Sequence, residues 1–183
     1  YLATAACFAI TVGRLYHSRA VVLVTFFLLA FIPTAWVAGA AGRVVREGLY
    51  ISQALMLVTL GIRCWVLPAM SPVAQQLREQ RRSLILMGLL AGWFWITREE
   101  GVWLLPAMLV LLAYWVLRQS NWRENWRSIL VFLALPLVMA SLLVGLVNTV
   151  NYVKYGVYRN NDFRSSDFQA GYAALTRIRH DQW

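Results

Sequence analysis

Charged residues are scarce in this chain. Only 14% of its 183 residues are charged, against about 25% in an ordinary soluble domain. The runs 83–97 and 101–117 hold no charged residue at all. Because 60% of the residues are hydrophobic and the mean hydropathy is +0.58, we expect an all-α protein, a polytopic bundle of transmembrane helices, and not a soluble domain.

Residues that usually bind metals or form disulfides are also rare. Cys7 and Cys64 lie in apolar runs without a Cys-x-x-Cys pair, so we expect two hydrophobic thiols. His17 and His180 are isolated in sequence, and no metal site is predicted. The chain has no glycine-rich phosphate loop, no Gly-x-Ser-x-Gly and no His-x-x-x-His, which argues against chemistry on nucleotide phosphates in the cytoplasm.

Six apolar segments of helical length follow one another along the chain. Pro33 should kink the second segment, and Gly156 should end the sixth. The polar segment 157–183 cannot be a further span, and we expect it to be extracytoplasmic and to begin a further region. Since Tyr1 stands inside an apolar run, we expect a fragment of a longer protein. The predicted segments are 1–13, 20–42, 49–70, 83–97, 101–117 and 129–155.

Basic residues are distributed unevenly between the two predicted sides of the membrane. With six spans, the short loops on one side of the membrane hold eight arginines. The loops on the other side hold Arg43, Arg46 and Arg98. By the positive-inside rule the richer side is cytoplasmic, which predicts a multi-pass protein of the prokaryotic plasma membrane. The net charge of +9 then reflects topology, and no nucleic acid partner is expected. The eight are Arg14, Arg19, Arg78, Arg81, Arg82, Arg118, Arg123 and Arg127.

Polar side chains recur along the third segment at helical spacing. Ser52, Met56, Thr59 and Arg63 fall on one face of a helix. We expect this stripe to face the bundle and not lipid. Arg63 is expected to extend toward the loop that follows, as long basic side chains near helix ends do.

The centre of the chain holds Arg98, Glu99 and Glu100 between two apolar runs. A single helix from 83 to 117 would be about 50 Å long, against about 30 Å for the hydrocarbon core of a bilayer. The chain must therefore turn at these charges, and Gly101 can take the positive φ that a turn requires. The cluster is either a binding site for a phosphate and a sugar hydroxyl or cation, or a hydrated turn with a local ion pair.

Two further clusters are predicted on the same outer side. Arg46 and Glu47 could bind a lipid phosphate, or could form a solvated pair at the start of a helix. Asn151, Tyr155 and Arg159 at the end of the sixth segment suit sugar recognition, although tyrosine at this depth is also common at membrane surfaces.

Two sequence motifs resemble those of a known enzyme family. The run from Leu89 to Gly101, Leu-Leu-Ala-Gly-Trp-Phe-Trp-Ile-Thr-Arg-Glu-Glu-Gly, and the run from Asn151 to Gly156, Asn-Tyr-Val-Lys-Tyr-Gly, are similar to segments of GT-C-type membrane glycosyltransferases. The likeness covers about the second half of the chain. It departs from the family at Glu99, where proline is usual, and after Gly156, where Pro-Asn is absent.

The resemblance implies transfer of a sugar from a polyprenyl-phosphate donor to an acceptor on the extracytoplasmic side. For such an activity we expect the charged and polar residues of the three clusters to bind substrate, namely Arg46, Glu47, Arg98, Glu99, Glu100, Asn151, Tyr155 and Arg159. Membrane lipid and the lipid-linked sugar are the expected partners, and a divalent cation could be bound. The family's catalytic acid lies in the first outer loop, which would precede Tyr1, so no catalytic residue is named.

Two other classes of protein remain open from the sequence alone. A transporter or flippase for a lipid-linked or anionic solute would also use short paired helices and charges near the membrane. A helix-bundle subunit without chemistry would tolerate exchange of the outer charges. An acidic residue in a loop upstream favours the enzyme, and a second copy of the short helix pair favours the transporter.

Overall fold

The computed structural model describes residues 1–32, 46–68, 72–97, 99–119, 122–159 and 166–177. Within these ranges the chain forms helices and turns but no strand. The prediction of an all-α protein is therefore confirmed.

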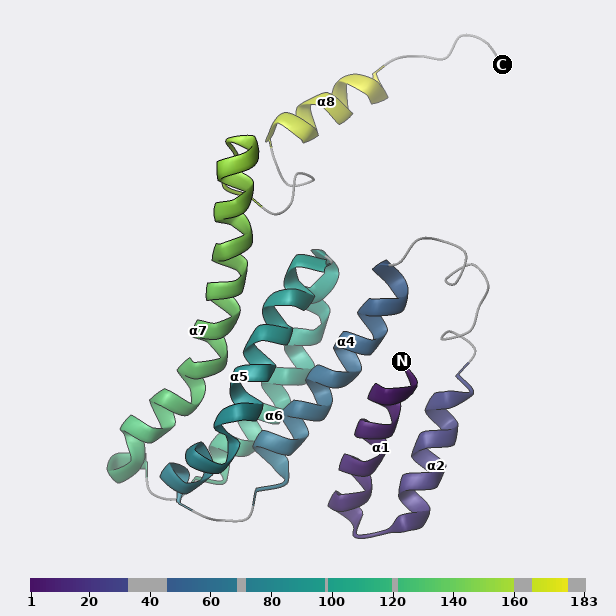
Figure 1. The fold of residues 1–183 in the computed structure, drawn as a ribbon, viewed down its shortest axis with the longest axis vertical. Helices are drawn as coiled ribbons and strands as arrows, with labels where there is room; N and C mark the ends of the chain where they lie inside the picture. Colours follow the sequence, from purple (N-terminus) through teal and green to yellow (C-terminus); the bar gives the residue numbers. More distant parts are fainter. Residues whose placement is uncertain (33–45, 69–71, 98, 120–121, 160–165, 178–183) are drawn as a thin grey trace. The chain divides into compact units, whose positions relative to one another are not determined.

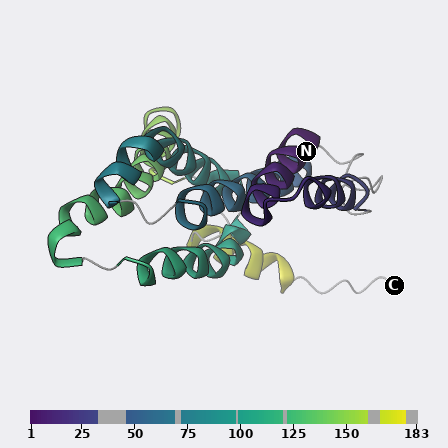
Figure 2. The ribbon, with the colours of Figure 1, turned by 90° about the horizontal axis from the view of Figure 1, so that it is seen from below.

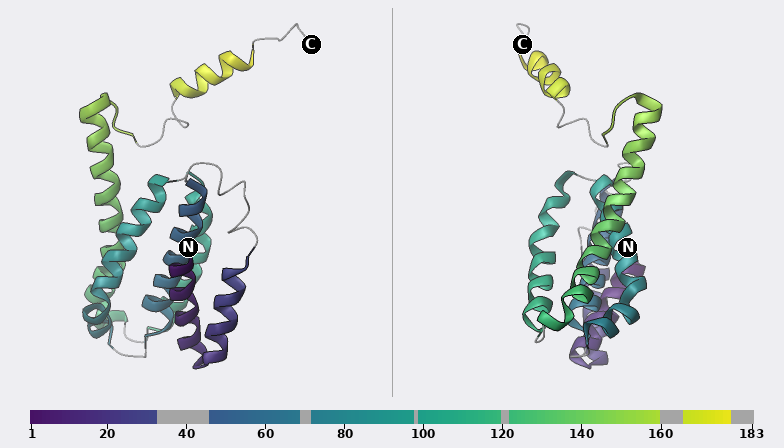
Figure 3. Two further views of the ribbon diagram at one scale, coloured as in Figure 1. Left: turned by 45° about the vertical axis from the view of Figure 1, so that its right-hand side comes forward. Right: turned by 90° about the vertical axis from the view of Figure 1, so that its left-hand side faces the viewer.

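The chain reverses direction repeatedly between its helices. The helix α1 runs one way with α4 and α6, and α2 and α5 run the other way (Figure 1), as the two views of Figure 3 also show. The helical elements are α1 (Leu2–Tyr16), α2 (Arg19–Ala30), α4 (Arg46–Gly61), the π-helix η2 (Ile62–Val66), α5 (Val73–Thr97), the 3₁₀-helix η3 (Glu99–Leu104), α6 (Leu105–Leu117), α7 (Trp122–Tyr155) and α8 (Ser166–Thr176).

The chain divides into two compact units, which are described separately. The first, Tyr1–Leu143, holds the helices from α1 to the first part of α7. Within it α4 is central, because it contacts α1, α5 and α6, and Figure 2 shows these neighbours around it. The second unit, Val144–Trp183, holds the end of α7 and the short helix α8.

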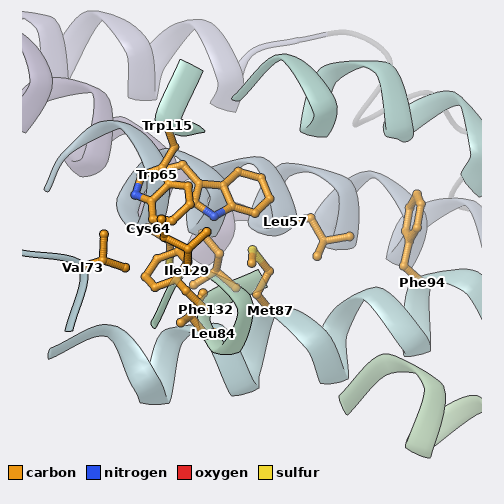
Figure 4. Close-up of a cluster of buried hydrophobic side chains, with 11 residues drawn as sticks. Leu57, Cys64, Trp65, Val73, Leu84, Met87, Phe94, Trp115, Ile129 and Phe132 are labelled. Atoms are coloured by element: carbon orange, nitrogen blue, oxygen red, sulfur yellow. The ribbon is translucent and has the colours of Figure 1, made fainter. Parts of the chain in front are cut away.

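A cluster of aromatic and aliphatic side chains forms the core of the first unit (Figure 4). Trp115 of α6 stacks on Phe132 of α7, with 4.5 Å between ring centroids and 8° between ring planes. The Trp115 indole Nε1 also donates a hydrogen bond of 3.0 Å to Oε1 of the buried Gln76 on α5. One tryptophan therefore joins three helices, and its polar atom is paired inside the core.

Two glycines let α5 approach α7 closely. A Cβ on Gly88 would collide with the Pro136 carbonyl oxygen and would lie 2.7 Å from the Met139 Cβ. A Cβ on Gly92, one helical turn later, would lie 2.9 Å from the Ala140 carbonyl oxygen. Since backbone atoms cannot move aside as flexible side chains do, this contact requires glycine at both positions.

Two of the described helices are long and apolar enough to cross a membrane. They are Leu49–Val66 and Arg123–Tyr155. This is fewer than the six spans predicted. The segments Leu2–Tyr16, Arg19–Ala30 and Gly101–Leu117 are apolar but shorter, and part of the predicted segment 20–42, with Pro33, lies outside the described residues.

Two helices begin earlier than the sequence predicted. The sequence predicted a loop before Ser83, but this stretch is helical from Val73. Pro72 stands at the start of α5, and the Pro72 carbonyl oxygen accepts hydrogen bonds from the Gln75 and Gln76 N–H groups at 2.9 and 3.1 Å. Likewise α7 begins at Trp122 and not at Ile129. The charged stretches before residues 83 and 129 were predicted to be loops. Arginine, glutamate and glutamine are nevertheless good helix formers, and they can occupy an exposed helical face.

Candidate functional site

Arginines gather at one end of the first unit, where α1, α4 and α6 end and where α2, α5 and α7 begin (Figure 1). Their side chains are exposed, or half-buried in the case of Arg118. The described acids at this end are Glu79 and Glu124. We call it the arginine-rich end, and its members are Arg14, Arg19, Arg78, Arg81, Arg82, Arg118, Arg123 and Arg127.

A hydrogen bond between side chains defines the opposite end of this unit. Gln53, in the second turn of α4, donates from Nε2 to the Thr97 Oγ1 at 3.3 Å. Thr97 is the last residue of α5. The start of α4 therefore lies beside the end of α5, 44 residues later in the chain.

Two of the predicted clusters lie at this opposite end. Arg46 and Glu47 are the first residues of α4, and Glu99 and Glu100 are the first residues of η3. The backbone thus brings together residues that are about 50 positions apart in sequence. Arg98 lies outside the described residues. The prediction that both clusters share one end agrees with this topology, and the contacts of their side chains stay a prediction.

Aromatic side chains fill the space beneath η3. Tyr50 of α4 stacks on the buried Phe94 of α5, with centroids 4.8 Å apart and ring planes at 20°. A Cβ on Gly101 would lie 3.1 Å from the Phe94 ring. The expectation that Gly101 takes a positive φ was wrong, since η3 continues through it and Gly156 is the one glycine with positive φ in the described chain. Gly101 instead allows close approach of η3 to Phe94.

Gln53 occupies a position where an amide is unfavourable for stability. The side chain is only 3% exposed, and its Oε1 has no hydrogen-bond partner within the described chain. A buried amide oxygen without a donor costs about 1–3 kcal/mol. A leucine at this position would avoid that cost.

The buried face of α4 differs by one residue from the predicted stripe. Thr59 is buried, but Ser52 and Met56 are half-buried and Arg63 is exposed. The face that enters the core is Gln53, Leu57 and Leu60 of α4, continued by Cys64 of η2. Its three apolar members at helical spacing were the signal in the sequence that could have identified Gln53 as a buried polar residue.

The third predicted cluster belongs to the second unit. Gly156, with φ of 72°, ends α7, and its N–H donates to the Tyr152 carbonyl oxygen at 2.8 Å. The chain then folds back, because Asn151 Nδ2 donates to the Arg159 carbonyl oxygen at 2.7 Å. Tyr155 is exposed. Gly156 as the end of this helix is confirmed, and the structure brings Asn151 and Arg159 together through the backbone of Arg159.

At the arginine-rich end, side chains from two helices cap the end of η2. Gln80 Nε2 donates to the Arg63 carbonyl oxygen at 3.1 Å, and Arg118 Nη1 donates to the Val66 carbonyl oxygen at 3.4 Å. Such bonds satisfy carbonyl groups that a helix end leaves open. Arg118 therefore has a structural role in addition to its charge.

No family model, curated protein or solved structure matches this chain. Within the described ranges, no three histidine, cysteine or acidic side chains are grouped so that they could hold a metal ion. The side chains of Glu47, Glu99 and Glu100 are not among those described, so a divalent cation at the opposite end stays a prediction.

Proposed function

We propose that this chain belongs to a multi-pass protein of a cell membrane. The helix Arg123–Tyr155 supports this placement, because its 33 residues extend about 50 Å at 1.5 Å per residue, enough to cross a bilayer, and the stretch 129–147 within it holds no charged residue. The exposed side chains Trp126 and Tyr152 lie near its two ends, where aromatic residues are common in membrane proteins. The arginine-rich end would face the cytoplasm of a prokaryotic cell.

We further propose that the complete protein is a glycosyltransferase that moves a sugar from a polyprenyl-phosphate donor to an acceptor on the extracytoplasmic side. The observation that carries the proposal is that two separate clusters with both signs of charge start at the same end of the first unit, away from the arginine-rich end. Opposite charges near a membrane surface suit a donor with an anionic phosphate and a polar sugar.

Each residue of the two clusters has a proposed task. Arg46 and Arg98 bind the donor phosphate and stabilise the negative charge that grows on it as the sugar leaves. Glu99 or Glu100 accepts hydrogen bonds from sugar hydroxyls or holds a divalent cation. A general base would deprotonate the acceptor hydroxyl, and the proposal assigns this role to none of the residues named here.

The test uses the full-length protein in membrane vesicles and a polyprenyl-phosphate hexose with a radiolabelled sugar. We expect label to move from the donor to an acceptor, and Arg98→Ala to reduce transfer by about 100-fold, as the loss of one charge-stabilising group does. Arg123→Ala, at the arginine-rich end, is the matched control and should transfer normally. If Arg98→Ala inserts and transfers like the unmodified protein, the assigned role of Arg98 is wrong.

A transporter or flippase for the same kind of lipid is the second candidate. One observation favours it: the chain between α5 and α6 passes through the 3₁₀-helix η3, and interrupted helices near charges are typical of transporter binding sites. The same vesicles separate the two functions. A flippase moves the labelled donor between leaflets and leaves the bond between sugar and phosphate intact.

A further inference from the structure

The hydrogen bonds around Thr97 set the orientation of the Gln53 amide. Thr97 Oγ1 donates to the Trp93 carbonyl oxygen at 2.8 Å. A hydroxyl has one hydrogen, so toward Gln53 it can only accept, and the group facing it must be the amide Nε2. The Gln53 Oε1 is therefore directed away from Thr97.

This amide oxygen is buried and lacks a donor within the described chain. The second buried glutamine of the unit, Gln76, differs in this respect, because its Oε1 accepts from Trp115. Two glutamines with the same 3% exposure thus have different roles. The amide of Gln76 joins helices of the core. The amide of Gln53 is held through its Nε2 by Thr97, and its buried oxygen has no donor within the described chain.

Gln53 and Thr97 lie close in sequence to the first residues of the two charge clusters. Gln53 lies six residues after Glu47 along α4, which is about 9 Å, and its partner Thr97 lies two residues before Glu99. Tyr50 and Phe94, which stack on each other between α4 and α5, lie three residues before Gln53 and Thr97, respectively, in the sequence. The amide is therefore at the end where the charged residues of the proposed site begin.

We propose that Gln53 is a substrate-binding residue whose Oε1 accepts a hydrogen bond from a hydroxyl of the sugar on the lipid donor, and that Thr97 is the positioning residue that orients the amide. This inference rests on the proposed function. It assigns recognition of the sugar to residues of α4 and α5.

Two lipids and two glutamine variants test the assignment in the full-length protein. The lipids are a short-chain polyprenyl-phosphate hexose and the same polyprenyl phosphate without sugar. We expect Gln53→Leu to raise the Kd for the hexose lipid by at least tenfold and the Kd for the bare lipid by less than twofold. Its melting temperature should not fall, because leucine removes a buried oxygen that lacks a donor.

Gln76→Leu is the matched control, since it removes a buried amide that has a partner. It should lower the melting temperature and leave both Kd values unchanged. Thr97→Val should raise the Kd for the hexose lipid by about threefold, and Thr97→Ser, which keeps the hydroxyl, should restore it.

Three results would overturn the inference. One is a Gln53→Leu variant with unchanged Kd for the hexose lipid in a protein that transfers hexose normally; the proposed function would then stand without this residue. Another is a melting temperature that falls as in Gln76→Leu with both Kd values unchanged, which would make the amide structural or a partner of bound water. The third is an unmodified protein that neither binds nor transfers hexose, in which case the proposed function fails as well.

Discussion

At the scale of single residues, two glycines near the ends of helices have different physical roles. Gly156 has a φ of 72° and no atom within 4 Å of the position a Cβ would occupy, so its backbone conformation alone requires glycine. Gly101 has no positive φ, and what requires glycine there is the Phe94 ring. The sequence shows only that both positions are glycine. The physical reason for glycine at each position depends on its surroundings in the structure.

Gly156→Ala should loosen the end of α7. The left-handed conformation costs an alanine about 1–2 kcal/mol, and no steric contact adds to this. We expect faster amide hydrogen exchange in the last turn, Val153–Tyr155. Gly156→Asn is the matched variant, and its effect should be smaller because asparagine tolerates this conformation. Equal exchange in both variants and the unmodified protein would contradict the assignment.

At the scale of elements, the contact of α5 with α7 depends on the absence of side chains. Gly88 and Gly92 are one turn apart on α5 and approach the backbone of Pro136 and Ala140 on α7. The motif that resembles a glycosyltransferase segment includes Gly92, so part of its pattern has a structural explanation. The same helix carries Thr97 at its end, so the packing of α5 also sets the position of the proposed sugar subsite.

Gly88→Ala should destabilise the protein by about 1–3 kcal/mol, because the added methyl group meets the backbone of α7. Gly61→Ala on α4 is the matched control. Its Cβ would lie 3.0 Å from Leu111 Cδ1 and 3.4 Å from Met108 Cε, which are ends of flexible side chains that can move. Alanine also favours a helix by about 1 kcal/mol over glycine, so this control should keep its stability. Thermal unfolding in detergent measures both, and equal stability would contradict the close contact.

At the scale of the whole molecule, charge is divided between two ends of the first unit. The eight arginines of the arginine-rich end lie with Arg63 and two acids at one end, and the starts of α4 and η3 lie at the other. Ends that differ in this way orient a membrane protein, because basic loops are retained in the cytoplasm. The proposed site then opens to the side where polyprenyl-phosphate sugars would be used.

Cysteine labelling tests this orientation. In a variant without Cys7 and Cys64, single cysteines are placed at Glu99 and at Arg123. We expect a membrane-impermeant maleimide to react with the first in intact cells, and with the second only after the membrane is opened. A third cysteine at Arg81 is the control and should behave like the one at Arg123. Labelling of positions 99 and 123 from the same side would refute the proposed topology.

The all-helical class, the turn between 97 and 105 and the end of α7 at Gly156 could all be predicted from the sequence. These features depend on composition, on the length of apolar runs and on the backbone freedom of one glycine, which are local properties. The starts of α5 and α7 were placed too late, because charged residues that form an exposed helical turn resemble a loop in sequence. The buried face predicted for α4 was also one residue away from the observed one. The prediction followed the polar residues, whereas the apolar residues at helical spacing face the core.

Only the tertiary structure decided which polar atoms are buried and which are paired. Gln53 and Gln76 are the same residue type, and both are 3% exposed. Their difference comes from which helix lies opposite: Trp115 of α6 supplies a donor to the Gln76 oxygen, whereas Thr97 of α5 accepts from the Gln53 nitrogen, and the Gln53 oxygen stays buried without a donor in the described chain. The sequence by itself determined that this chain folds as helices and where its charges are concentrated. The pairing of helices far apart in the chain determined which of its buried polar atoms have a hydrogen-bond partner.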